Sequence, residues 1–425
     1  MIGRPRISVI VPTHGRPSSV LRTLRALEGQ LEPVAMEVIV VLDGPSEESE
    51  RALRSLMTTF PLDVLVQEQA GAASARNRGA DRARAAVLLF LDDDVEPLPG
   101  LLAAHLRAHE SSPGAVVLGP YWPEIPVTRR LHPIMVREWW AATFTGMSKP
   151  GHRFGYRDLL AGNLSIPAEI FRARSGFDPA FPMAGGEDWE LGIRLLRSGA
   201  AFVYTPDAAA RHHESSTPAK SFRRARLEGA GDVRIGLRHP WLRGDLPFAW
   251  WRKAGRLKRF VRWVAFRAPA VGDLAVAVAP WPLHVLDVLR CRAMWHRLGH
   301  TVRHYCYWRG VAELLPGVDD LDAFLDPGAR TDPAWREIEL DLRAGLPEGR
   351  RRLDIERPDA VRLRYGSMDL GAMPPIPGLE PLAGRHLDAV LETLGVPLFA
   401  LSLAMENASL SPALPPRLGE EAAIP

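Results

Sequence analysis

The chain has 425 residues, 46% of them hydrophobic and 24% charged, which predicts two or three globular domains and excludes an intrinsically disordered chain. Its two cysteines, Cys291 and Cys306, are too few for a disulfide framework or a cysteine zinc site, so we expect a reducing, cytoplasmic setting. The net charge of +3 is uneven, because residues 219–267 carry 14 Lys or Arg against 3 acids, a local +11 that leaves −8 elsewhere.

The first ninety residues alternate apolar strand patterns with helical ones. Strands are predicted over 7–12, 37–42, 62–66 and 87–91, and helices from Ser18 or Ser19, over 47–59 and within 71–80. This alternation predicts βαβ units, right-handed crossovers and a largely parallel sheet. No Gly-x-Gly-x-x-Gly follows the first strand, which argues against a dinucleotide-binding dehydrogenase.

Three adjacent carboxylates, Asp92, Asp93 and Asp94, end the fourth strand. Because like charges repel, the cluster favours a bound divalent cation, and hard oxygen ligands select Mg²⁺ or Mn²⁺. Ligands of open α/β sheets bind at the carboxyl ends of strands, where this cluster lies. An Asp-rich turn can also simply cap the next helix, so the triplet alone leaves both interpretations open.

The small-residue stretch 71–80 precedes that strand and contains Arg76. A helix N-terminus with small residues and a fixed cation suits a diphosphate, although an Ala-rich packing helix has the same composition. A helix over 101–109 and a strand over 116–118 follow. The connection 120–155, rich in Pro and Trp, is typical of a lid or substrate loop, or of a packed excursion without a catalytic role.

A strand over 161–167 leads to Gly185-Gly186 and an amphipathic helix that opens with Glu187 and Asp188. Acids in a first helical turn are explained by the helix dipole, but paired acids after a flexible glycine turn also suit a positioned general base. A strand over 201–204 precedes Arg211-His212-His213-Glu214, where a histidine could complete a metal site.

Five motifs in this order resemble those of the inverting nucleotide-sugar glycosyltransferases of family two. They are 8–12 with Thr13, 40–44, 71–79, 92–94 and 186–190. The resemblance covers residues 7 to about 214. It implies an α/β fold of the GT-A type: a Rossmann-like, mostly parallel sheet flanked by helices, here with a mainly helical C-terminal extension.

The resemblance also implies roles for individual residues. Pro12, Thr13 and Asp43 would surround the nucleobase, and Arg76 with Asn77 would contact the nucleotide. Asp92 would bind the ribose side, Asp93 would be secondary, and Asp94 would bind Mg²⁺ or Mn²⁺ bridging the diphosphate. Asp188, of the Glu187-Asp188 pair, would deprotonate the acceptor, and His212, chosen over His213, would be a further metal ligand. The Gln-x-x-Arg-Trp motif of processive synthases is missing, which favours one transfer per encounter.

The sequence therefore predicts a metal-dependent inverting glycosyltransferase that moves a sugar from a nucleoside-diphosphate sugar to an acceptor hydroxyl. The acceptor would be a glycan, a lipid-linked or a small molecule, in cell-envelope glycan, glycolipid or glycosylated natural-product synthesis. One alternative is a degenerate glycosyltransferase-like scaffold, against which the intact Arg76, Asp94 and Asp188 argue. Another is a nucleotidyltransferase, which would need a Gly-rich triphosphate loop and would not need Asp188.

Three segments are expected: a catalytic domain over 1–218, a basic aromatic helical region over 219–315 and a C-terminal region of unassigned role over 316–425. Lys and Arg interleaved with Trp and Phe over 219–267 favour an anionic membrane surface on the cytoplasmic side over nucleic acid, for which no motif is present. A helical subdomain with a solvated basic face is the alternative. Residues 268–289 are moderately apolar, but Asp273, Pro280, Pro282, His284 and Asp287 argue against a membrane span, and a re-entrant or surface-lying hairpin is the alternative.

The C-terminal region has weaker patterns. We expect a helix over 335–342, linkers at 345–349 and 373–378, a strand over 362–365, a helix over 386–394 and disorder over 411–425.

Overall fold

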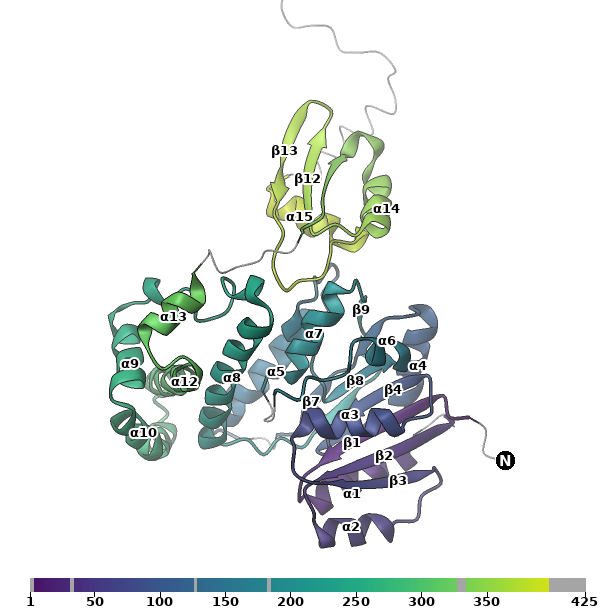
Figure 1. The fold of residues 1–425 in the computed structure, drawn as a ribbon, viewed down its shortest axis with the longest axis vertical. Helices are drawn as coiled ribbons and strands as arrows, with labels where there is room; N and C mark the ends of the chain where they lie inside the picture. Colours follow the sequence, from purple (N-terminus) through teal and green to yellow (C-terminus); the bar gives the residue numbers. More distant parts are fainter. Residues whose placement is uncertain (1–3, 31–33, 126–127, 182–184, 327–333, 397–425) are drawn as a thin grey trace, which may run out of the picture. The chain divides into compact units, whose positions relative to one another are not determined.

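The computed structural model describes residues 4–30, 34–125, 128–181, 185–326 and 334–396 (Figure 1). Contacts divide the chain into two compact units. One comprises Met1–Lys149, Phe154–Pro333 and Pro377–Glu380, and the other Pro150–Arg153, Ala334–Ile376 and Pro381–Pro425. The helical region expected as a separate segment thus shares a unit with the α/β domain.

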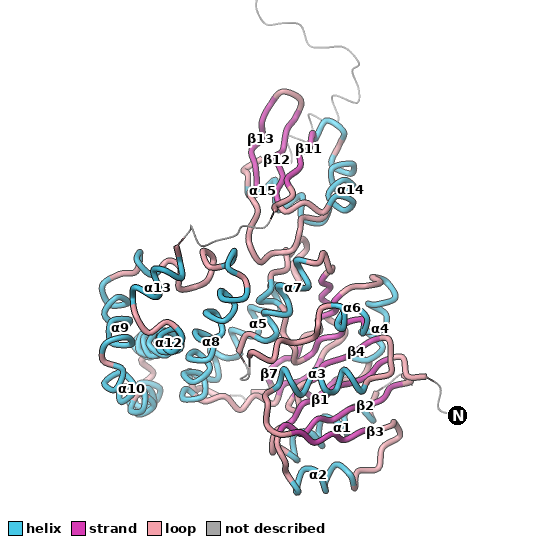
Figure 2. The backbone as a smooth tube through the Cα atoms, in the orientation of Figure 1, coloured by secondary structure: helices cyan, strands magenta, loops and turns pink. Residues whose placement is uncertain are grey.

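A seven-stranded sheet of order β3-β2-β1-β4-β8-β6-β9 forms the centre of the first unit (Figure 2). Its strands are β1 (Ile7–Thr13), β2 (Met36–Asp43), β3 (Leu62–Gln67), β4 (Val87–Leu91), β6 (Val116–Leu118), β8 (Asn163–Pro167) and β9 (Phe202–Tyr204). The first four are parallel, and β8 is antiparallel to both β4 and β6. The predicted mostly parallel sheet is confirmed, and its central strand β4 is a continuous apolar run because both faces of the sheet are covered.

Helices α1 (Pro17–Glu28), α2 (Glu47–Arg54), α3 (Ala72–Arg82) and α4 (Leu101–Ser111) connect the strands, and α6 (Ala168–Ala173) and α7 (Glu187–Arg197) follow β8. On α3, a Cβ at Gly79 would lie 2.5 Å from Cγ2 of Ile10, so this glycine lets α3 pack directly on β1. The connection 120–155 is not a simple loop, because it contains α5 (Leu131–Met147).

A second, small sheet of order β5-β10-β7 joins three segments far apart in the sequence. Its strands are β5 (Val95–Pro97), β7 (Tyr121–Pro123) and β10 (Ala210–His212). Sequence analysis identified none of the three, since each is only three residues long. Because β10 is antiparallel to β5, the sheet brings His212 opposite Val95, next to the aspartate cluster.

The helical region comprises α8 (Pro218–Arg238), α9 (Arg256–Arg267), α10 (Pro269–Val278), α11 (Pro280–Val288), α12 (Arg292–Leu314) and α13 (Val318–Leu325) (Figure 1). Helices α8 and α12 approach closely, because a Cβ at Gly310 would overlap the carbonyl oxygen of Arg226. Helices α10 and α11 form one apolar stretch, Pro269–Val288, whose length and mean hydropathy of 1.3 would allow it to cross a membrane.

The second unit is built on a three-stranded sheet of β11 (Glu337–Asp341), β12 (Ala360–Tyr365) and β13 (Met368–Met373), with helices α14 (Leu346–Glu356) and α15 (Leu387–Thr393). The helix predicted over 335–342 is wrong, because β11 occupies that stretch. The linker predicted at 345–349 is also wrong, since α14 begins there. The strand at 362–365 and the last helix are confirmed. The disorder predicted over 411–425 lies outside the described residues.

Candidate active site

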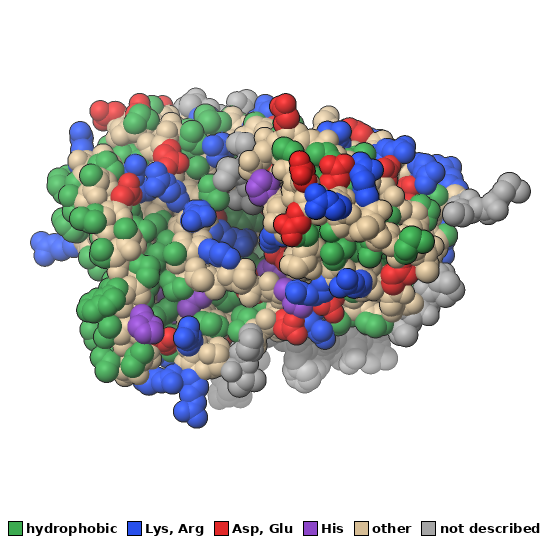
Figure 3. Space-filling model, turned by 90° about the horizontal axis from the view of Figure 1, so that it is seen from below, with side chains coloured by type: hydrophobic (Ala, Val, Ile, Leu, Met, Phe, Trp, Pro, Cys, Tyr) green, Lys and Arg blue, Asp and Glu red, His purple; other side chains and the backbone are tan. Residues whose placement is uncertain are grey.

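A cavity of about 480 Å³ lies at the carboxyl ends of β1, β2 and β4, between them and the first turns of α7 and α8. Figure 3, which views the molecule from below relative to Figure 1, shows a hollow near its centre. The site residues that line the cavity are Pro12, Thr13, Asp43, Arg76, Asp92, Asp93, Asp94, Glu187, Asp188 and His212. Of the residues predicted for the site, only Asn77 is not among those lining it.

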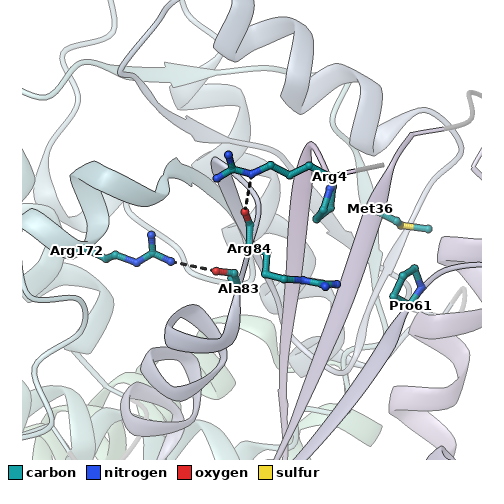
Figure 4. Close-up of a pocket in the computed structure, with 7 residues that line it drawn as sticks. Arg4, Met36, Pro61, Ala83, Arg84 and Arg172 are labelled. Atoms are coloured by element: carbon teal, nitrogen blue, oxygen red, sulfur yellow. Dashed lines mark hydrogen bonds between the residues drawn. The ribbon is translucent and has the colours of Figure 1, made fainter. Parts of the chain in front are cut away.

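A different pocket, of about 670 Å³, lies at the amino ends of the strands and contains Arg4, Arg84 and Arg172 (Figure 4). Two of its arginines bond to backbone carbonyls, Arg172 to Ala83 and Arg4 to Arg84. None of the predicted site residues lines it, so the chemistry belongs to the cavity at the opposite end of the sheet.

Two of the three adjacent aspartates pair with one cation, Arg16, a residue that sequence analysis did not identify. Its guanidinium lies 2.7 Å from Asp93 Oδ1 and 2.9 Å from Asp94 Oδ2. Asp93 is 1% exposed and also accepts a hydrogen bond from the Thr13 hydroxyl at 2.6 Å. Burial raises the pKa of Asp93 to about 7, against the opposing effect of Arg16. Asp93 thus anchors the loop internally, in line with the secondary role expected of it.

Arg76, from α3, joins the two halves of the site. It is 5% exposed and donates to Asp92 Oδ1 at 2.7 Å and to Glu187 Oε1 at 3.1 Å. The guanidinium is therefore occupied by protein carboxylates, whereas the sequence predicted a contact with the nucleotide. Its position fixes the end of β4 relative to the start of α7.

The two adjacent acids Glu187 and Asp188 have different hydrogen-bond partners. Glu187 is 5% exposed and accepts hydrogen bonds from Arg76 and from the Gly185 N–H at 2.8 Å. These bonds hold Glu187 in place at the cavity, and its catalytic role stays a prediction. Gly186, at φ 106°, turns the chain into α7 and presents Asp188 to the cavity.

Asp188 has the pKa that general-base catalysis near neutral pH requires. Burial raises the pKa of this carboxyl to about 7, and the negative charge of Glu187 adds to the effect, while Arg76 opposes it. The backbone N–H of Trp189 donates to Asp188 Oδ1 at 2.9 Å. Two acids of α7 are among the described residues that line the cavity, Glu187 and Asp188. Because Glu187 is paired with Arg76, Asp188 is the one available to a substrate.

His212 lies next to Asp94 and His213 does not. The His212 Nε2 atom is 3.5 Å from Asp94 Oδ1, whereas His213 is paired with Glu96 and Glu124 at 2.6 and 2.8 Å. Burial would lower the pKa of His212, but the bond to Asp94 and its charge outweigh it and raise that pKa. Tyr121 and Trp140 pack edge-on against the His212 ring, each with its centroid 5.6 Å away, and fix its orientation.

Of the two residues Asp43 and Asn77, both expected near the nucleotide, Asp43 lines the cavity and Asn77 does not. Asp43 accepts hydrogen bonds from the N–H groups of Ala70 and Gly71 at 2.8 and 2.9 Å, so it orders the turn into α3 at the edge of the cavity. Both amide atoms of Asn77 bond to the backbone of Phe177 instead of facing the cavity. The predicted contact of Asn77 with the donor is therefore corrected to a structural role.

The first turns of α8 add cations that sequence analysis assigned to a membrane surface. Lys220, Arg223 and Arg224 line the cavity on the side of Asp188 and His212. Thr217 caps the helix by accepting from the Lys220 N–H at 3.3 Å, and Pro218 occupies its first turn. Only the tertiary structure shows that this end of the basic region belongs to the site.

Asp94 and His212 fit as a pair of ligands for Mg²⁺ or Mn²⁺. The described residues contain no group of three or more His, Cys, Asp or Glu that could hold an ion alone. Magnesium, however, is usually bound by one or two carboxylates together with substrate phosphates and water. The Nε2 atom of His212 is on the side of Asp94, 3.5 Å from its Oδ1, while Nδ1 lies 3.7 Å from Glu214 Oε2, and both His212 and Asp94 line the cavity. This donor set suits a cation that binds together with a diphosphate.

Residues 8–171 match the family model described as Glycosyl transferase family 2, and residues 142–215 match the N-terminal domain of galactosyltransferase. The chain is 34% identical over 222 residues to validoxylamine A glucosyltransferase of Streptomyces hygroscopicus subsp. limoneus, covering 46% of this chain and 49% of that protein. It is 24% identical over 261 residues to the uncharacterized glycosyltransferase YfnE of Bacillus subtilis, covering 51% and 67%.

The chain thus spans about half the length of the first of these relatives. Among solved structures, it is similar to the mannosyltransferase PcManGT from Pyrobaculum calidifontis in complex with GDP-Man and Mn²⁺. That likeness has a TM-score of 0.47 and 19% identity, and covers 73% of this chain and 88% of the other.

Proposed function

Because residues 8–171 match the Glycosyl transferase family 2 model, we propose that the chain transfers a sugar from a nucleoside-diphosphate sugar to an acceptor hydroxyl with inversion at the anomeric carbon. The observation that carries the proposal is Asp188, a carboxylate at the cavity whose pKa is raised to about 7. Its neighbour Glu187 is held by Arg76, so α7 supplies one base.

The reaction is a single displacement. The acceptor oxygen forms a bond to the anomeric carbon while its proton passes to Asp188. The bond between that carbon and the diphosphate oxygen breaks, and its electron pair leaves with the nucleoside diphosphate. One base and no covalent intermediate on the enzyme give inversion. General-base help of this kind is typically worth about 10²–10⁴-fold in rate.

The leaving group develops negative charge, which the cavity is equipped to receive. Asp94 and His212 would hold Mg²⁺ or Mn²⁺, which when bound neutralises diphosphate charge. Lys220, Arg223 and Arg224 line the same cavity and contribute positive charge.

The names of two relatives guide the choice of acceptor. Besides validoxylamine A glucosyltransferase, the chain is 27% identical over 230 residues to the O-antigen biosynthesis protein RfbC of Myxococcus xanthus. We therefore infer a hydroxylated small molecule, or a precursor of a cell-envelope glycan or glycolipid, as the acceptor. A cytoplasmic location, at or near the inner face of the membrane, follows from this setting.

The test begins with thermal shifts of the protein with UDP-, GDP- and dTDP-sugars, with and without Mn²⁺, since a ligand of the native state raises the melting temperature. The donor that gives a shift is then used for turnover. We expect Asp188→Asn to lose about 10²-fold or more in kcat while the donor-induced shift remains. Asp207→Asn, at an exposed acid that does not line the cavity, is the matched control.

The stereochemistry of the product provides an independent check. An α-linked donor should give a β-linked product, readable from the anomeric coupling constant in NMR. A retained configuration would exclude single displacement. Loss of donor binding in Asp188→Asn would assign Asp188 to the donor site instead of the acceptor side.

A further inference from the structure

The exposed large apolar side chains are concentrated on one part of the helical region. Phe260 and Trp263 of α9 are 60% and 56% exposed, and Trp281 of α11 is 74% exposed. The others in the same region are Trp250, Leu257, Val271, Leu274, Val278, Val288, Leu289 and Met294. Figure 3 shows hydrophobic side chains gathered at the left of its view, over the end of the molecule that holds α9 and α10. Apolar patches of this kind mark an interaction surface.

Helices α10 and α11 have two apolar faces. Val271, Leu274, Val278, Trp281 and Val288 repeat at helical spacing and are all exposed. Gly272, Ala279 and Leu283 lie on the other face, which is buried. The stretch Pro269–Val288 has the composition of a lipid-contacting helix. Only 17% of its most apolar 18-residue segment is buried inside the protein.

The buried face ties these helices to the protein. The hydroxyl of Tyr305, on α12, donates to the Pro269 carbonyl and to Asp273 at 2.9 and 2.8 Å. Asp287 accepts from the Leu131 N–H at 2.8 Å. Both acids that argued against a membrane span are thus satisfied by protein groups. A span would break these bonds, whereas contact with one leaflet leaves them intact.

The apolar face is bordered by cations. Residues 250–294 carry nine Lys or Arg against two Asp, and both of those Asp take part in the contacts above. Arg256, Arg259 and Arg267 are exposed and have no acidic partner among the described residues. Phe260 and Trp263, on the same helix as these cations, stack with ring centroids 6.0 Å apart. A border of cations and Trp beside an apolar face is the pattern of an interfacial segment on anionic lipid.

A cavity of about 830 Å³ opens beside this face, lined by Trp250, Lys253, Arg256, Lys258, Arg262, His304 and Trp308 among others. Arg262 is 8% exposed, donates to the Trp251 carbonyl at 2.8 Å and stacks on the rings of Trp251 and Trp308. It has no carboxylate partner among the described residues, and a buried cation without a counter-charge is costly.

The same cavity contains unused hydrogen-bonding groups. Trp308 is 3% exposed, and its Nε1 is buried without a hydrogen-bond partner. The Nε2 atom of His304 is also buried and unpartnered. His304 and Trp308 line this cavity together with Arg262 and Lys258. An anion with several acceptor oxygens would satisfy them and supply the missing counter-charge.

We propose that the face formed by α9, α10 and α11 docks on an anionic lipid bilayer, and that the cavity next to Arg262 and Trp308 receives a phosphate headgroup of that bilayer. This inference does not depend on the proposed sugar transfer. The apolar stripe of α10–α11 enters the leaflet without crossing it. The headgroup phosphate accepts from Trp308 and pairs with Arg262.

The experiment is sedimentation of the full chain with vesicles of phosphatidylcholine alone or mixed with phosphatidylglycerol. We expect binding only to the mixed vesicles, with a strong dependence on salt. Leu274→Glu/Trp281→Glu should weaken binding at least ten-fold, because two exposed apolar side chains no longer enter the leaflet. Arg256→Gln should weaken it about five-fold. Ile355→Glu, equally exposed at 65% in the second unit, should leave it unchanged.

The cavity is tested separately. Trp308→Phe removes the N–H and keeps a ring, so we expect weaker binding to the mixed vesicles with an unchanged urea midpoint. If Trp308→Phe binds the mixed vesicles as tightly as the unsubstituted chain but loses binding of inorganic phosphate in calorimetry, the cavity is a site for free anions and the headgroup assignment is wrong. Equal binding to both vesicle types, or none, would overturn the docking proposal. A dimer that Trp281→Glu converts to a monomer would assign the face to a second copy of the chain.

Discussion

Arg76 is the residue whose removal the structure predicts to be most revealing, because it joins Asp92 and Glu187 from different elements. Arg76→Met keeps most of the side-chain volume and leaves Glu187, 5% exposed, without its guanidinium. Breaking a buried pair by removing one partner costs about 3–5 kcal/mol. The measurement is the urea midpoint of unfolding, and Arg78→Met, at an exposed arginine of the same helix, is the control.

A double-mutant cycle that combines Arg76→Met with Glu187→Gln measures the interaction energy between Arg76 and Glu187. In Arg76→Met/Glu187→Gln the buried charge is removed together with its partner, so the double variant should lose less stability than the sum of the single variants. The coupling should lie in the range of about 0.5–3 kcal/mol expected for residues in contact. If the free energies of unfolding simply add, the two residues are independent and the assigned role of Arg76 is refuted.

The same variants move the pH dependence of activity in opposite directions. Glu187 raises the pKa of Asp188 and Arg76 lowers it. Asp188 acts as a base only when deprotonated, so activity falls as pH falls through its pKa of about 7. The acidic limb of kcat/KM should therefore move to higher pH in Arg76→Met and to lower pH in Glu187→Gln. Limbs that stay in place in both variants would show that another group titrates.

Three further outcomes follow from local geometry. Gly310→Ala would push the new Cβ into the Arg226 carbonyl and should cost about 1–3 kcal/mol in urea unfolding, whereas Gly299→Ala on the same helix meets its nearest atom at 3.8 Å and should cost nothing. His212→Ala should weaken Mn²⁺ binding in the presence of nucleotide about ten-fold or more by calorimetry, and His213→Ala should not. Arg16→Gln should strengthen Mn²⁺ binding in the same titration, because Arg16 competes for Asp94.

The sequence predicted those parts of the fold whose secondary structure is evident from the apolar pattern of a single short segment. The strands β1, β2 and β4 are mostly apolar, and all of their residues except Met36 and Val87 are buried, so their sequence pattern reflects their place in the core. The place of Asp92–Asp94 follows from the end of β4. Fold class and the carboxyl-end location of the site therefore followed from the sequence.

Predictions were wrong where one segment fits both a helical and a strand pattern. They were incomplete where the contacts join residues far apart in the sequence. The segment of β11 alternates Glu and apolar residues, with Ile338 and Leu340 buried and Glu337 and Glu339 exposed, a period of two that was misread as a helix. The pairing of Arg16 with Asp94 spans 78 positions in the sequence, and that of Arg76 with Glu187 spans 111. No local pattern indicates which arginine meets which acid.

The two arginines of the site differ in a way that bears on how it works. Arg76 is 5% exposed and holds its carboxylates in a fixed frame. The side chain of Arg16 is 53% exposed, so exchanging its partners costs little desolvation. A diphosphate and a cation arriving at Asp94 can therefore displace Arg16 while the frame around Asp92 and Asp188 stays unchanged. The aspartates at the end of β4 thus have arginine partners before a substrate binds, and only the exposed arginine, Arg16, has to move.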